Sequence, residues 1–331
     1  MPQFGFHLSG EELAPDVMVP AARRAEEIGF DFITVSDHFH PWTRQQGESP
    51  FVWTVLGAIA HATERVGLGT AVTCPTVRIH PAIIAQAAAT TARMSGGRFF
   101  LGVGTGEALN EHILGARWPS SGVRREMLEE AIEVIRLLWQ GGSQSHFGRH
   151  YTVEQAAIFT LPAAPPPIVV SGFGDHSIDL AARVGDGYFT TAPDAEAVGR
   201  YRAGGGTGPC YSKLDVAVAE SAGAARRLAL RTWPNSALGG ELAQILPLPA
   251  HFEQATKNVT EDMVAGSILC EQDPGAHVER LKEYADAGYD RVTVQQVGVE
   301  QARFLEMYER SVLPALAGST AAALMVESTP Q

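Results

Sequence analysis

Short runs of β-branched and aromatic residues alternate along the chain with longer segments that have the period of an α-helix. The first pair is typical: Phe4–Leu8 is predicted to be a strand, and Pro15–Ile28 a helix that begins at proline and ends before Gly29. Eight strands are predicted in this way, over 4–8, 32–35, 66–72, 98–103, 168–170, 187–190, 214–219 and 291–295. The predicted helices between them include 52–63, 81–94, 127–139, 178–184 and 275–287.

This alternation favours a parallel sheet covered by helices. Eight such units favour closure of the sheet into an α/β fold of the (β/α)8 TIM-barrel type. The alternative is an open, doubly wound sheet, but Ser9-Gly10-Glu11 follows the first strand where a dinucleotide-binding sheet would carry a glycine-rich fingerprint. We therefore expect one barrel domain over 1–316, an irregular insertion over 233–270 before the last strand, and a frayed tail over 317–331.

Charge and cysteine content narrow the possible settings and partners. The 331 residues carry 37 acidic and 25 basic side chains, for a formal net charge of −12. An acidic surface repels nucleic-acid phosphates and anionic lipids, so neither partner is expected. The three cysteines lie far apart and the histidines show no metal-ligand spacing, which predicts a reducing cytoplasmic setting and no metal. We find no apolar segment typical of a membrane span or a secretion signal.

Polar and glycine-rich segments follow several predicted strands, always at the same end. Ser9-Gly10-Glu11 follows the first strand, the segment 36–42 the second, 104–111 the fourth and 171–175 the fifth. In a parallel barrel the reacting groups lie at the carboxyl ends of the strands. The sequence therefore predicts an active site where these segments meet.

Two residues of these segments are candidates for proton transfer. His38 is the candidate general base, because imidazoles titrate near neutral pH, or it only satisfies a loop carbonyl. Asp37 either holds that imidazole in one tautomer or caps the following turn. Glu107 follows a Gly-x-Gly turn and is a candidate proton donor, or an acid that offsets a helix dipole. Glu111, one turn further on, fits the dipole interpretation better.

Three motifs carry a resemblance to a known family: Val35-Ser36-Asp37-His38-Phe39-His40-Pro41-Trp42, Leu101-Gly102-Val103-Gly104-Thr105-Gly106-Glu107-Ala108-Leu109-Asn110-Glu111 and Val184-Gly185-Asp186-Gly187. They resemble the luciferase-like superfamily of flavin and deazaflavin enzymes. Within it they are similar to the coenzyme F420-dependent glucose-6-phosphate dehydrogenase group. The resemblance extends from Phe4 to Leu316, and its second motif is more specific for this group than for FMN monooxygenases of the same fold.

The resemblance implies coenzyme F420 as the cofactor and residues that would bind it. A non-prolyl cis peptide at Ala71–Val72 would pack behind the deazaflavin ring. The implied ring contacts are Asp37, Thr105, Gly106 and Asn110, and the implied phosphate contacts are Gly172, Phe173 and Gly174. Free N–H groups at a helix start suit the phosphate role.

The resemblance also implies how a hydride would leave an alcohol carbon. His38 would take the hydroxyl proton, and Glu107 would protonate the deazaflavin ring. Trp42 would stabilise the charge that develops. Glu11 matches a further acid on the substrate side. Removal of the O–H proton is what allows the hydride to leave, and base assistance contributes roughly 10²–10⁴-fold.

The chain departs from this group where the substrate would bind. The sugar-phosphate enzymes hold the phosphate with lysines, whereas Thr191 and Asp194 follow the sixth strand here and Gly266 falls at a second lysine position. A carboxylate repels a phosphate dianion, so we expect glucose 6-phosphate to be a poor substrate and a non-phosphorylated sugar or secondary alcohol to be preferred. Alternative cations are Lys257, Arg231 and Arg202.

Other function classes stay open at this point. An F420H2-dependent reductase or an FMN-dependent monooxygenase would use the same barrel, and so would a non-catalytic cofactor-binding protein. The presence of both His38 and Glu107 argues against the last of these. Relatives of this fold commonly form dimers, so a homodimer is expected. The sequence determines neither the substrate nor the direction of hydride transfer.

Overall fold

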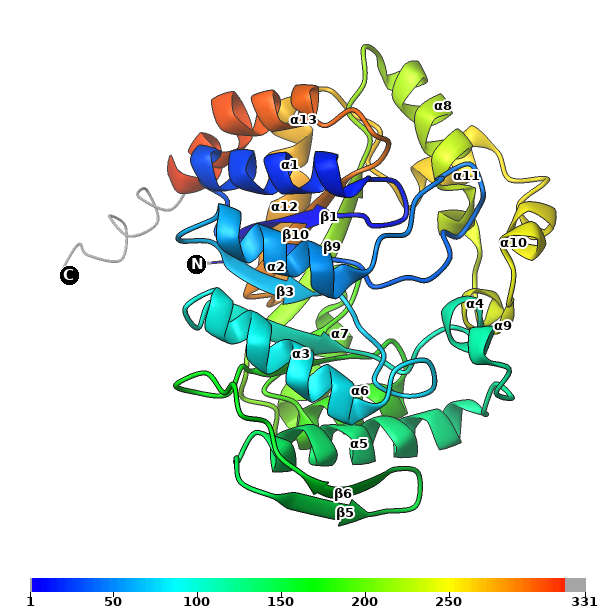
Figure 1. The fold of residues 1–331 in the computed structure, drawn as a ribbon. Helices are drawn as coiled ribbons and strands as arrows, with labels where there is room; N and C mark the ends of the chain where they lie inside the picture. Colours follow the sequence, from blue (N-terminus) through cyan, green and yellow to red (C-terminus); the bar gives the residue numbers. More distant parts are fainter. Residues whose placement is uncertain (1, 319–331) are drawn as a thin grey trace.

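The computed structural model describes residues 2–318 and contains a closed barrel of parallel strands (Figure 1). Neighbouring strands pair in the order β1-β10-β9-β8-β7-β4-β3-β2. Their bounds are β1 (Gln3–Leu8), β2 (Phe32–Val35), β3 (Gly67–Thr70), β4 (Phe99–Val103), β7 (Ile168–Ser171), β8 (Gly187–Phe189), β9 (Cys210–Val216) and β10 (Arg291–Gln296). The predicted barrel is confirmed. Only β9 is clearly displaced, since it begins at Cys210 instead of Leu214 and so includes Lys213.

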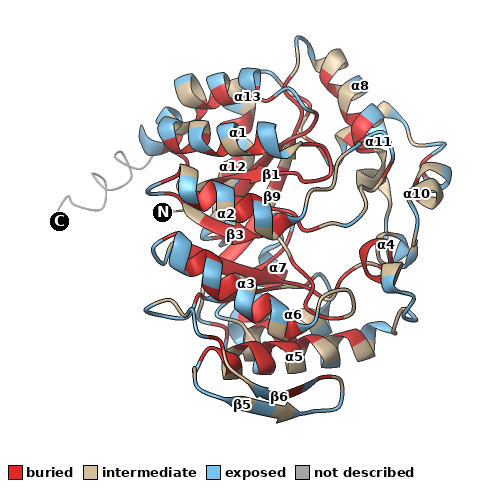
Figure 2. Ribbon diagram, in the orientation of Figure 1, coloured by how far each residue is buried: buried red, intermediate tan, exposed pale blue. Residues whose placement is uncertain are grey.

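Helices cover the outside of the barrel and pack their apolar faces on the strands. They are α1 (Pro15–Ile28), α2 (Val52–Ala62), α3 (Pro81–Met94), α5 (Ser121–Leu138), α6 (Asp175–Val184), α7 (Ala195–Ala203), α8 (Ala222–Thr232), α12 (Pro274–Asp286) and α13 (Ala302–Met307), which continues through η3 (Tyr308–Val312). Gly29 ends α1 as predicted, with φ 104° and its N–H bonded to the carbonyls of Ala25 and Glu26. Figure 2 shows the buried strands and the exposed outer faces of these helices.

Several elements lie outside the regular alternation. A hairpin of β5 (Gln144–Phe147) and β6 (Thr152–Ala156) pairs antiparallel next to α5, where no strand was predicted. The short helices α4 (Ala108–Glu111) and η1 (His112–Leu114) follow β4. Segment 233–270 contains the short helices η2 (Pro234–Ala237), α9 (Leu242–Ile245), α10 (Pro249–Ala255) and α11 (Glu261–Ala265). In Figure 1, α9, α10 and α11 lie on the same side of the barrel as α4, at the carboxyl ends of the strands.

The interior of the barrel changes from apolar to polar along the strands. An apolar floor is formed by Phe32, Phe100, Val169, Phe189 and Tyr211. The next inward layer is polar: Nδ1 of His7 lies 2.9 Å from the hydroxyl of Thr34, which lies 2.9 Å from the hydroxyl of Thr293. All three of these side chains are buried. The floor seals one end, and polar side chains face the carboxyl-end mouth.

Some predictions concern residues at the limit of the structure. Of the predicted tail over 317–331, residues 319–331 lie outside the described residues, and 317 and 318 continue the helix after η3. Within 2–318, no helix combines the length and apolar character that a membrane span needs. The same residues contain no group of three or more His, Cys, Asp or Glu side chains arranged to hold a metal ion.

Candidate active site

Glu11 and His38 form a buried acid–imidazole pair at the carboxyl ends of β1 and β2. Nε2 of His38 lies 3.3 Å from Oε1 of Glu11. The other carboxylate oxygen accepts hydrogen bonds from the hydroxyls of Ser9 at 2.9 Å and Ser36 at 2.5 Å. Burial alone would raise the pKa of Glu11, but the His38 ring and the Ser36 hydroxyl outweigh it and lower the pKa to about 2. Glu11 is therefore an anion at neutral pH.

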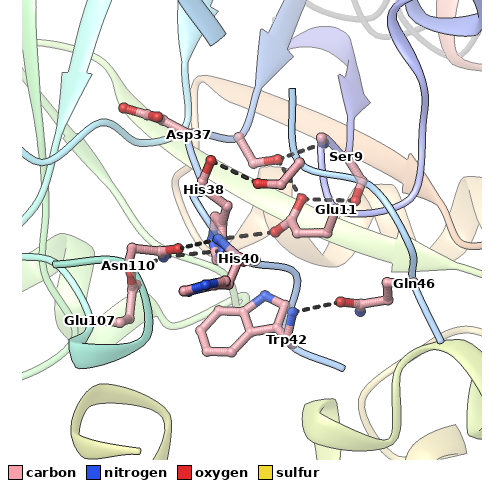
Figure 3. Close-up of polar contacts among 12 residues, drawn as sticks. Ser9, Glu11, Asp37, His38, His40, Trp42, Gln46, Glu107 and Asn110 are labelled. Atoms are coloured by element: carbon pink, nitrogen blue, oxygen red, sulfur yellow. Dashed lines mark hydrogen bonds and ion pairs between the residues drawn. The ribbon is translucent and has the colours of Figure 1, made fainter. Parts of the chain in front are cut away.

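Asn110, on α4, connects the His38 loop to Glu107 (Figure 3). Its Oδ1 accepts the backbone N–H groups of Phe39 at 2.9 Å and of His40 at 3.2 Å. Its Nδ2 lies 3.1 Å from Nδ1 of His38 and 3.4 Å from Oε2 of Glu107. Since two N–H groups require an oxygen on one side of the amide, the NH2 group must face His38 and Glu107.

These contacts define which nitrogen of neutral His38 carries the proton. Asn110 donates to Nδ1, so the neutral ring carries its hydrogen on Nε2, where it faces Glu11. A protonated ring keeps that contact and gives its second N–H to the carbonyl of His40, 3.1 Å from Nδ1. A protonated ring would also turn its Nδ1–H toward the NH2 group of Asn110, so uptake of a proton at Nδ1 requires that amide to shift.

Trp42 lies against His38 and is held there by the insertion. The two ring centroids are 5.0 Å apart, with the planes tilted by 58°. The indole also meets Phe252 of α10 edge to face at 5.2 Å, and the backbone N–H of Trp42 donates to Oε1 of Gln46 at 2.8 Å. Segment 233–270 therefore supplies one wall of the site.

Asp37 does not orient the imidazole, so that suggestion from the sequence is wrong. Its carboxylate pairs with Arg78 at 2.8 Å and accepts the hydroxyl of Thr73, and Figure 3 shows it directed away from His38. Successive residues at a strand end point in opposite directions, which separates the two side chains. Glu111 joins this buried group: it accepts the backbone N–H of Arg78 at 2.6 Å, and burial raises its pKa to about 7.

The turn after β4 approaches the end of β3 closely because it contains glycine. A Cβ on Gly104 would lie 2.8 Å from Val72, and Gly106 has φ +82°, which other residues rarely adopt. Thr105 between them is half-buried. The peptide bond Ala71–Val72 is cis and non-prolyl, as expected. That these residues contact a cofactor ring stays a prediction.

Residues 172–174 lie between β7 and the start of α6. Gly174 is the N-cap of this helix and makes no side-chain cap hydrogen bond. The N–H groups of the first turn are thus not capped by a side chain, and they suit an anionic ligand. Phe173 beside them is 62% exposed, which is unusual for a phenylalanine without a partner surface.

Asp194 has a structural partner within its own helix. Its Oδ1 accepts the backbone N–H of Ala197 at 3.0 Å and so caps α7. Both Asp194 and Thr191 are exposed, and Gly266 ends α11. Among the described residues, no ion pair joins a lysine or arginine to Asp194.

The three alternative cations fall in different places. Arg202 lies beside Gln3 and Arg291 at the amino ends of the strands and pairs with Asp290 at 3.1 Å, so the suggestion that it serves the substrate is wrong. Arg231 lines a cavity of about 500 Å³ at the rim with Arg44. Lys257 is exposed.

Sequence reasoning missed Lys213, a charged side chain that shares the inward face of β9 with Tyr211. It was left out because the strand was predicted to begin at Leu214. The signal was available: strands of a parallel barrel are covered on both sides and are normally apolar, so the pattern Tyr211-Ser212-Lys213-Leu214-Asp215 places charges where none are expected.

The amino-acid sequence matches a known family along most of its length. The family model described as luciferase-like monooxygenase matches residues 2–291. An F420-dependent glucose-6-phosphate dehydrogenase of Nakamurella multipartita is 34% identical over 326 residues, which cover 95% of this chain and 96% of that protein. One of Segniliparus rotundus is 36% identical over 334 residues, with 95% and 98% covered.

Solved structures agree with this match. An F420-dependent secondary alcohol dehydrogenase in complex with an F420–acetone adduct superposes with a TM-score of 0.89 at 29% identity, covering 96% of this chain and 99% of that one. A coenzyme F420-dependent tetrahydromethanopterin reductase from Methanopyrus kandleri has a TM-score of 0.75 at 20% identity and supports the fold alone.

Proposed function

The chain belongs to the luciferase-like family, and we propose that it is a coenzyme F420-dependent oxidoreductase that acts on the CH–OH group of a sugar or other alcohol. The hydrogen-bonded series Glu107–Asn110–His38–Glu11 beside Trp42 is the observation that carries this proposal. It joins a candidate proton donor to a candidate proton acceptor at the carboxyl end of the barrel. Active sites of this fold lie there.

The residues expected to hold the cofactor fit it chemically. The start of α6 offers N–H groups for a phosphate, next to the exposed ring of Phe173. The turn at Gly106 adjoins Cη2 of Trp118, and Nε1 of the same ring is buried without a hydrogen-bond partner among residues 2–318, which leaves a donor for a polar ligand. Bound here, coenzyme F420 supplies the acceptor for a hydride. Asp37, Thr105 and Asn110 are the proposed neighbours of its ring.

His38 is the proposed base for the substrate hydroxyl. The Glu11 anion faces Nε2 and the carbonyl of His40 faces Nδ1, so each N–H of the charged ring has an acceptor once the NH2 group of Asn110 moves away from Nδ1. An acceptor that stabilises the charged form of a base favours proton removal. Trp42 covers the ring and limits the access of water to it.

Glu107 is the proposed proton donor on the other side of Asn110. Its carboxylate oxygen lies 3.4 Å from Nδ2 of Asn110, which keeps it at the edge of the site instead of next to Glu11. The two acids are therefore separated by the imidazole and the amide.

We also propose that the substrate lacks a phosphate. The exposed carboxylate of Asp194 stands where the sugar-phosphate enzymes are expected to hold a lysine, and Arg44 at the rim is already paired with Glu253 at 2.5 Å. A phosphate dianion would be repelled by the carboxylate of Asp194. The charge of Arg44 is already matched by Glu253. Glucose should therefore be preferred over glucose 6-phosphate.

A spectroscopic assay tests the proposal. Purified protein is mixed with F420 and candidate alcohols, and the visible absorbance of the deazaflavin should bleach as hydride is transferred. Replacement of His38→Ala should abolish bleaching and leave F420 binding, followed by fluorescence, intact. Efficient turnover of glucose 6-phosphate would overturn the substrate part, and full activity of H38A would remove His38 from the base role. Bleaching only with FMN in place of F420 would overturn the cofactor.

A further inference from the structure

The strand β9 carries two charged side chains into the barrel. Alternate residues of a strand share a face, so Lys213 and Asp215 point inward together with Tyr211 of the apolar floor. The pairing of β9 with β10 sets Lys213 opposite Thr293 and Asp215 opposite Gln295. The charged pair thus lies between the floor and the carboxyl-end mouth.

Lys213, Asp215 and Gln295 form one charge-balanced group. Nζ of Lys213 lies 2.7 Å from Oδ1 of Asp215 and donates to Oε1 of Gln295 at 2.9 Å. Apolar residues would fill this part of a barrel at a lower cost in desolvation. Because the lysine charge is already matched, the group suits a neutral polar ligand better than an anion.

Gln295 holds a hydrogen-bond donor that nothing in the described chain uses. The side chain is fully buried, and its Nε2 has no partner among residues 2–318. Lys213 binds the amide oxygen, so the amide cannot turn over without placing its NH2 group against an ammonium. A buried donor without an acceptor is costly, and an oxygen atom of a ligand would satisfy it.

Aromatic side chains connect this group to the candidate base. The ring of Trp233 lies 5.5 Å from Nζ of Lys213, and Trp42 packs against the apolar cluster that contains Trp233. Trp42 in turn lies 5.0 Å from His38. The electrostatics agree, since burial and then Lys213 lower the pKa of His7 to about 3, and His38 acts on the same ring.

We propose that Lys213, Asp215 and Gln295 form a subsite that binds a second hydroxyl group of the substrate, which is therefore an uncharged diol or sugar. This inference rests on the function proposed above and narrows its substrate class. One hydroxyl group lies at His38, and another accepts from Nε2 of Gln295 and donates to the Asp215 carboxylate. A hydroxyl group can do both at once, whereas a methyl group can do neither.

Matched alcohols that differ by one hydroxyl group test the subsite. The pairs are 2-butanol with 2,3-butanediol and cyclohexanol with 1,2-cyclohexanediol, assayed by F420 bleaching. Wild-type protein should show a kcat/KM about ten-fold or more higher for the diol of at least one pair. Gln295→Met keeps the length of the side chain and removes the donor, and it should lower that diol-to-alcohol ratio about ten-fold.

The neighbouring Gln296 supplies a matched control. It lies on the same strand, but its amide bonds to the backbone of Val218 and Val297 instead of Lys213. Gln296→Met should lower the Tm and keep the diol-to-alcohol ratio. Gln295→Met should lower the ratio, and its Tm should change less than that of Gln296→Met, because the unsatisfied donor it removes offsets the hydrogen bond from Lys213 that it loses.

The outcomes separate the two proposals. Turnover without a diol preference in the wild-type protein, or a ratio that Gln295→Met leaves unchanged, would overturn the subsite alone. No bleaching with any alcohol or diol, although F420 binds, would overturn the proposed function and the subsite with it.

Discussion

Nε2 of His38 lies 3.3 Å from the buried carboxylate of Glu11, although the two residues follow different strands. The serine hydroxyls that bond to Glu11 hold it in this position. An anion next to an imidazole stabilises the ring once it has accepted a proton. The pair therefore explains why His38 suits a base, and it leads to the first prediction.

Glu11→Gln should impair proton removal while the site keeps its shape. The amide is neutral, so the charged imidazole loses its counter-charge, and we expect kcat/KM for an accepted alcohol to fall about 10- to 100-fold. F420 affinity, measured by fluorescence titration, should be retained. Glu27→Gln on the exposed face of α1 is the matched control. Wild-type kinetics in E11Q would contradict the role of the pair.

Glu107→Gln should separate proton donation from binding. The amide keeps the size of the side chain but cannot release a proton at neutral pH, so kcat should fall about 10²-fold with a small change in KM. Steady-state measurements that determine kcat and KM separately check this. An unchanged kcat would mean that Glu107 is not the proton donor.

Asn110→Ala should lower both stability and activity. The substitution leaves the N–H groups of Phe39 and His40 without their acceptor, and it removes the donor to Nδ1 of His38. We expect the free energy of unfolding to fall by about 1–3 kcal/mol in urea titrations. The exposed Asn258→Ala serves as the control and should change neither quantity. Unaltered stability of N110A would show that this bridge contributes nothing to the fold.

Glu12→Gln should remove a pH dependence of stability. Burial raises the pKa of Glu12 to about 7 from 4.5, so between these pH values the folded protein holds a proton that the unfolded chain has released. The contribution of this group to the free energy of unfolding thus falls as pH rises from about 4.5 to about 7. The free energy of unfolding of E12Q should be higher than that of the wild type. The difference should grow over this pH window and reach on the order of 2–3 kcal/mol at pH 8.

Thermal and urea unfolding of both proteins between pH 5 and pH 8 checks this. His7 acts in the opposite direction, because burial lowers its pKa to about 3 and its charged form opposes folding as the pH falls below 6.5. Only the difference between E12Q and the wild type reports on Glu12. A difference that is independent of pH would contradict the raised pKa.

The architecture could be predicted because its signals are local. Apolar runs, helical periods and the glycine after Ile28 each act over a few residues, and the barrel follows from their alternation. The hairpin of β5 and β6 was not predicted, because its strands are polar and only partly buried. The start of β9 was misplaced because Lys213 and Asp215 interrupt the apolar pattern that marks a buried strand.

By itself the sequence determined that polar segments would meet at one mouth of a barrel, since parallel strands deliver their carboxyl ends to the same side. It did not determine which side chains would touch there. Glu11 instead of Asp37 faces His38, and Lys213 reaches Gln295, because strand pairing and the alternation of side chains across each strand set those contacts. Contacts between residues far apart in the chain depend on the closure and register of the barrel, and no local pattern records them.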